Sequence, residues 1–157
     1  MALRHDDDWP RRLGKPDRLL GVLQWADLDA LWQRLRASAE GWYVGVAGQD
    51  LPGRPEVAAD LLQRVADIDA TLRREHRLAV CGIVYVDDLD DPRYVEVFDP
   101  VGLGGMCAHP GAPPRPRWVL SRSAPVPSQA VNSSDAPVPA TARPGWWPRV
   151  KALALRR

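Results

Sequence analysis

Apolar residues recur with helical spacing in two stretches of the chain. From Asp27 to Glu40 they take positions i, i+3, i+4 and i+7, and this stripe consists of Leu28, Leu31, Trp32 and Leu35. From Pro55 to His76 the same kind of spacing joins Val57, Leu61, Val65, Ile68 and Leu72. The pattern predicts two amphipathic helices, each with one face turned toward a core.

Four other stretches have the composition and period of β-strands, and they are residues 42–47, 78–86, 93–98 and 117–121. Residues 78–86 form a nearly continuous apolar run, which is typical of a strand buried on both faces. In the stretch 93–98 the period of two predicts that Tyr94, Glu96 and Phe98 share one face. The Asp-rich segment 87–92 predicts a turn that joins two of these strands as a hairpin. The fold class that follows is α+β, with two helices on one face of a mainly antiparallel four-stranded sheet.

Composition divides the chain into a domain and a tail. The 157 residues are 45% hydrophobic and 26% charged, as in a soluble globular protein. Residues 1–105 hold 13 basic and 19 acidic side chains, whereas residues 106–157 hold 8 basic and one acidic. We therefore expect an N-terminal extension over 1–24, a globular domain over 25–122, a disordered Pro/Ser/Ala-rich linker over 123–142 and a basic peptide over 143–157. Two cysteines, no secretory leader and no long apolar run indicate a cytoplasmic protein.

The C-terminal peptide carries the residue types that dominate protein interfaces. Tryptophan and arginine are frequent hot spots, and nothing in the linker sequence offers a core that would bury two adjacent tryptophans. The sequence therefore predicts a docking peptide for a larger protein partner, with the contact made by Trp146, Trp147, Arg149, Val150 and Leu153. Attachment to a membrane surface and folding back onto the acidic domain remain alternatives. Nucleic-acid binding is disfavoured because the domain itself is acidic.

A thiol and an imidazole lie two residues apart in the glycine-rich segment that precedes the last predicted strand. Cys107 and His109 form a metal-binding or reactive-thiol candidate, with Cys81 or His76 as further ligands or helpers. The spacing is a weak signal, because zinc needs four ligands, and the sequence favours a structural loop over a metal site or a catalytic thiol. The glycines lack the strand–loop–helix context of a nucleotide site. We therefore expect neither a catalytic residue nor a cofactor, with a thiol- or metal-dependent protein as the alternative.

One stretch resembles a motif of small, uncharacterised bacterial proteins. The matching segments are Val84–Asp88, Pro92, Phe98–Pro100, Leu103–Gly104, Cys107 and Pro116–Arg122. The resemblance covers about 40 residues and implies a compact bacterial domain that is accessory to a larger enzyme, such as a redox or metal enzyme. It carries over no site residues, and Ala108 and His109 depart from the pattern. Together these observations predict a non-enzymatic accessory or adaptor protein.

Overall fold

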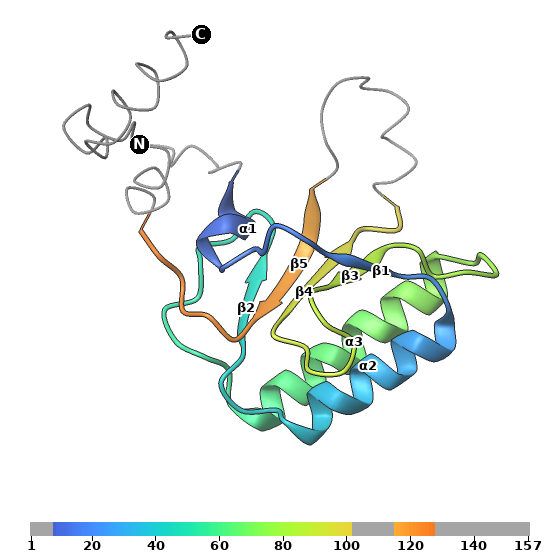
Figure 1. Ribbon diagram of the computed structural model, residues 1–157, viewed down its shortest axis with the longest axis horizontal. Coiled ribbons are helices and arrows are strands. Elements are labelled where there is room, and N and C mark those ends of the chain that lie inside the picture. The colour runs from blue at the N-terminus through green and yellow to red at the C-terminus, as the bar shows by residue number, and fades with distance from the viewer. Residues whose placement is uncertain (1–7, 102–114, 128–157) are drawn as a thin grey trace, which may run out of the picture. The chain divides into compact units, whose positions relative to one another are not determined.

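The computed structural model describes residues 8–101 and 115–127. The element order is α1 Trp9–Arg12, β1 Leu20–Val22, α2 Trp25–Ala37, β2 Tyr43–Val46, α3 Ala58–Glu75, β3 Val84–Val86, β4 Tyr94–Phe98 and β5 Pro116–Ser121 (Figure 1). The protein is therefore an α+β fold, as the sequence predicts. The two long helices, α2 and α3, form in the two stretches where apolar residues recur with helical spacing. His76 is the C-cap of α3.

The strands form one five-stranded sheet in the order β1-β3-β4-β5-β2, and every neighbouring pair is antiparallel. The hairpin joining β3 to β4 is confirmed. The prediction of four strands and two helices misses β1 and α1. Both lie within residues 1–24, where no hydrophobic period is long enough to reveal a three-residue strand or a single helical turn.

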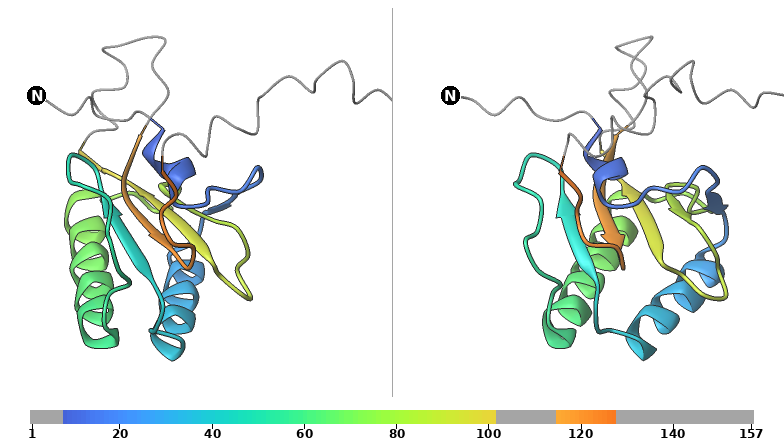
Figure 2. Two further views of the ribbon diagram at one scale, coloured as in Figure 1. Left: turned by 90° about the vertical axis from the view of Figure 1, so that its left-hand side faces the viewer. Right: turned by 60° about the vertical axis from the view of Figure 1, so that its left-hand side comes forward.

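Helices α2 and α3 cover one face of the sheet (Figure 2). The buried residues of α2 are the four of the predicted stripe, and those of α3 are Leu61, Val65, Ile68 and Leu72. Val57 lies one residue before α3 and is exposed, so its predicted place in the stripe is wrong. The helices pack against Val84 and Val86 of β3 and against Val95 and Val97 of β4.

The opposite face of the sheet is covered by the N-terminal segment, residues 8–19. Trp9 and Leu13 pack there against Tyr94 and Val119. Val126, which the sequence places in the linker, exchanges two hydrogen bonds with Arg12: its N–H donates to the Arg12 carbonyl, and its carbonyl accepts from Arg12 Nε. Because both faces are covered, all five residues of β4 are buried.

One strand prediction needs correction. The apolar run 78–86 forms a strand only at its end, because Gly82 has φ +67° and turns the backbone away from the regular ladder. Leu78 and Val80 in the first half are exposed rather than buried. A register irregularity between Val97 and Phe98 lies in the pairing with β5, where Phe98 pairs with Pro116 and Arg117 is skipped. The Phe98 ring packs edge-on against Tyr85 at 5.5 Å, and Tyr85 pairs with Glu96, as expected if Phe98 and Glu96 share a face.

Candidate functional site

The predicted docking peptide and the Cys-x-His pair lie outside the described residues. This holds for Trp146, Trp147, Arg149, Val150 and Leu153 and likewise for Cys107 and His109. Both sites therefore stay predictions from the sequence. The functional surface that the structure offers comes from the folded domain.

Cys81 and His76, the proposed helpers of the Cys-x-His pair, are buried parts of the fold. The ring of His76 donates a hydrogen bond from Nε2 to the Cys81 carbonyl over 2.7 Å. Burial raises the pKa of the Cys81 thiol above its usual 9.0, although two backbone amides partly oppose this. A neutral, buried thiol is a poor nucleophile. Across residues 8–101 and 115–127, no group of three His, Cys, Asp or Glu side chains is arranged to hold a metal ion.

Exposed apolar side chains concentrate at one edge of the sheet. Eight large hydrophobic side chains are exposed among the described residues, and four of them lie on β1 or on the loop beside it. We call these four the edge patch: Leu20 (53% exposed), Leu23 (60%), Leu78 (61%) and Val80 (45%). Scattered exposed leucines are ordinary, but a group at the rim of a sheet indicates an interaction surface.

Hydrogen bonds hold the two halves of the edge patch together. The N–H of Cys81 donates to the Leu23 carbonyl over 2.7 Å, and the N–H of Gly82 donates to the Val22 carbonyl over 2.9 Å. Trp25 Nε1 donates to the Leu78 carbonyl over 3.0 Å. The loop 76–81 is thus fixed beside β1 by its backbone and by Trp25.

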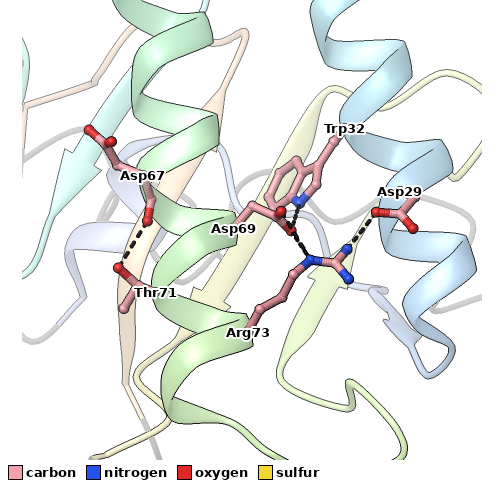
Figure 3. Close-up of polar contacts among 6 residues, drawn as sticks. All are labelled: Asp29, Trp32, Asp67, Asp69, Thr71 and Arg73. Atoms are coloured by element: carbon pink, nitrogen blue, oxygen red, sulfur yellow. Dashed lines mark hydrogen bonds and ion pairs between the residues drawn. The ribbon is translucent and has the colours of Figure 1, made fainter.

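A polar network between α2 and α3 holds Trp25 in turn. Arg73 on α3 contacts Asp69 with Nε at 3.0 Å and reaches Asp29 on α2 with Nη2 (Figure 3). Asp69 also accepts a hydrogen bond from Trp32 Nε1, at 3.0 Å. The Arg73 guanidinium lies 5.1 Å from the centre of the Trp25 ring. These groups satisfy one another, so the network braces the helices and positions the edge patch.

A buried carboxylate lies on the other face, under the N-terminal segment. Glu96 is 1% exposed, and its Oε1 accepts a hydrogen bond from the Tyr94 hydroxyl at 2.8 Å and pairs with Lys15 Nζ at 2.9 Å. Ser121 Oγ beside it donates to the Leu13 carbonyl. The contacts of Lys15 and Leu13 join the N-terminal segment to the sheet. Because Lys15 and the Tyr94 hydroxyl both stabilise the Glu96 carboxylate, its buried charge is tolerated.

A shallow cavity of about 530 Å³ lies at the start of α3, lined by residues that include Arg54, Glu56, Asp60, Arg64 and Asp67. Glu56 Oε1 pairs with Arg64 at 2.9 Å. The cavity lining mixes both signs of charge. Among the described residues, Glu56 Oε2 is buried without a hydrogen-bond partner, but the side chain is 19% exposed and its other oxygen is held by Arg64, so the edge patch is the stronger candidate.

The edge patch was missed at the level of sequence. The pattern of apolar residues predicts a buried strand for Leu78 and Val80, and Leu20 and Leu23 lie in the predicted N-terminal extension. Gly82, which breaks the apolar run, is the one signal in the sequence that predicts a shorter strand. None of the described helices is long and apolar enough to cross a membrane. Comparison with protein-family models, with curated proteins and with solved structures gives no match to this chain.

Proposed function

We propose that this protein is a non-enzymatic accessory protein that binds a larger protein through two contacts. The first is the edge patch of the folded domain, and the second is the C-terminal peptide around Trp146 and Trp147. The observation that carries the proposal is the concentration of exposed leucine and valine at the β1 edge. Apolar surface of this kind gains free energy when a partner removes it from water.

Two contacts on one chain strengthen each other. Once one has formed, the other acts at a high effective concentration set by the residues between them, so neither needs a large interface. The rigid placement of the edge patch supports this role, because Trp25 and the Cys81 amide hold its loop in position before any partner arrives. A preformed surface loses less entropy on binding.

The proposal is tested by capture from an extract of the source cells with the full-length chain and three variants. Leu23→Lys disrupts the edge patch, and Trp146→Ala combined with Trp147→Ala disrupts the peptide. Leu62→Lys is the matched control, because Leu62 is also an exposed leucine (38%) but lies on α3. A partner identified by mass spectrometry is then purified and its affinity measured for each variant.

We expect the wild-type chain and Leu62→Lys to bind the same purified partner equally. Leu23→Lys should lose about tenfold or more in affinity, since a buried, unpaired ammonium replaces an apolar contact. The double tryptophan variant should lose a comparable amount. Equal affinities for Leu23→Lys and Leu62→Lys would show that the edge patch plays no part in binding.

A further inference from the structure

Strand β1 is an edge without the usual protection against pairing. In the described part of the chain its one strand neighbour is β3, and it contains neither a proline nor a charged residue. Natural edge strands are commonly guarded by lysine, proline or a covering segment, because their free N–H and C=O groups pair readily with another strand. At β1 the outer edge of the sheet coincides with the edge patch. This combination suits the addition of an extended partner segment.

The two ends of β1 differ in chemistry. Beside its C-terminal end lie Leu23, Leu78 and Val80, so that end is apolar. Leu20 at the other end pairs with Val86, and Val86 is followed directly by the acidic turn, residues 87–91. That turn contains Asp87, Asp88, Asp90 and Asp91.

The acidic turn keeps a surplus of negative charge. Arg34 pairs with Asp90 and Arg93 pairs with Asp91, so two carboxylates have a cationic partner. Asp87 and Asp88 instead accept hydrogen bonds from backbone amides. The amides of Asp90 and Asp91 lower the pKa of the exposed Asp88 carboxyl, which is therefore ionised at neutral pH. A partner residue at this end of β1 is favoured if it is basic.

The sheet also suggests the direction of the added strand. All four pairings within it are antiparallel, and antiparallel pairs are slightly more stable per residue than parallel ones. A segment running antiparallel to β1 passes Leu23 first and reaches the acidic turn last. We propose that the edge patch binds an extended protein segment that pairs antiparallel with β1, with apolar residues first and lysine or arginine last. This inference rests on the proposed function and names the kind of partner it requires.

The test uses synthetic peptides and the full-length chain. The first peptide has six alternating valine and threonine residues followed by two lysines, and the second has the reversed sequence. A third is the first peptide with alternate backbone nitrogens methylated, which removes donors that strand pairing needs. Binding is measured by fluorescence anisotropy of labelled peptides. We expect the first peptide to bind about tenfold more tightly than either of the others, a difference of about 1.4 kcal/mol.

Two sets of variants locate the binding site. Leu23→Lys should abolish binding of the first peptide, whereas Leu62→Lys should leave it unchanged. Asp87→Asn combined with Asp88→Asn keeps the oxygen acceptors of the turn but removes two charges. It should weaken the lysine peptide several-fold while leaving a peptide with threonine in place of lysine unaffected. Addition of salt should have the same selective effect on the lysine peptide.

Each outcome separates this inference from the proposed function. Equal binding of the methylated and unmethylated peptides, or no peptide binding at all, would rule out strand addition. Tighter binding of the reversed peptide would show that the added strand runs parallel, contrary to the proposal. If Leu23→Lys loses the purified partner although no peptide binds, the accessory function stands and strand addition is wrong. If the peptides behave as expected but no partner is captured, the pairing site stands and the accessory function is wrong.

Discussion

The two edges of the sheet are built in opposite ways. Neighbouring chain lies along the β2 edge: the N–H of Glu56 donates to the Trp42 carbonyl at 2.8 Å, and Leu51 packs together with Tyr43 against the cluster that contains Trp9 and Leu13. No residue of β2 is an exposed large hydrophobic. The β1 edge, by contrast, carries the edge patch.

The difference arises from what each edge strand packs against. Gly45 in β2 lies under Trp9 and Leu13, so close that an added Cβ would come within 2.6 Å of both side chains. Gly21 in β1 meets only the Tyr85 ring, at 3.5 Å. The face of β2 at Gly45 is thus part of a packed interior, whereas the same face of β1 at Gly21 is more open. Packing of the N-terminal segment explains the tight β2 side, and the proposed partner binding would explain the exposed apolar residues at β1.

The largest expected effect on stability comes from weakening the contact between the N-terminal segment, residues 8–19, and the sheet. Lys15→Met removes the counter-charge of Glu96, which is 1% exposed. We expect a loss of about 2–3 kcal/mol in the free energy of unfolding, less than for a fully buried pair because Lys15 is partly solvated. Denaturant unfolding at pH 7 measures it. Lys15→Arg, which keeps the charge, is the control, and an equal loss in both variants would contradict an electrostatic role.

The next prediction compares the change in stability when one glycine of each edge strand is replaced by alanine. Gly45→Ala should cost about 1–3 kcal/mol, because Trp9 and Leu13 must move to admit the new methyl group. Gly21→Ala should change stability by less than about 1 kcal/mol and in the stabilising direction, since its Cβ makes an ordinary contact and alanine restricts the unfolded chain. Thermal and denaturant unfolding of the two variants provide the comparison. Equal destabilisation at both sites would mean that the β1 edge is as tightly packed as β2.

The covered parts of the fold could be predicted from the sequence, and the open edge could not. Helices α2 and α3 have long periodic stripes, so their existence and buried faces follow from spacing alone. β1 has three residues, and its partner β3 lies more than sixty residues away in the chain. A strand this short is defined by tertiary pairing rather than by its own pattern.

The candidate site was missed for the same physical reason. The apolarity of residues 78–80 is visible in the sequence, but the sequence gives no measure of exposure. Exposure follows from the turn at Gly82 and from the hydrogen bond of Trp25 to Leu78, which hold the loop at the rim of the sheet. Exposed and buried apolar runs look alike until the backbone geometry is known.

Alkaline pH should destabilise the covered side through Tyr94. Burial, followed by the charge of Glu96 and the hydrogen bond to it, raises the pKa of the Tyr94 phenol far above its usual 10.0. Above pH 10 the unfolded chain releases this proton and the folded protein retains it, so stability present below pH 10 is lost as the pH rises. The slope approaches about 1.4 kcal/mol per pH unit. Tyr94→Phe should show a shallower slope between pH 10 and 11, and identical slopes would contradict the assignment.

Trp25→Phe should loosen the β1 edge while leaving the β2 edge unchanged. It removes the hydrogen bond to the Leu78 carbonyl, at a cost of about 1 kcal/mol. The Gly82 amide donates to Val22 in β1, and the Cys81 amide donates to Leu23, the residue after β1. Hydrogen exchange of both amides should become faster. The Ala47 amide, which donates to the Arg117 carbonyl at the far edge, is the internal control. Uniform acceleration of all three amides would indicate a general loss of stability instead.

The smallest effect on stability should come from the substitution with the largest effect on binding. Leu23→Lys and Leu62→Lys both place an ammonium on an exposed side chain, so each should change the free energy of unfolding by no more than about 0.5 kcal/mol. Only Leu23→Lys should lose the partner. A residue whose apolar character matters for binding but not for folding contributes to an interface, because stability alone gives no reason to keep a leucine there. Should Leu23→Lys prove strongly destabilising, Leu23 would instead belong to the core, and the contrast between the two edges would disappear.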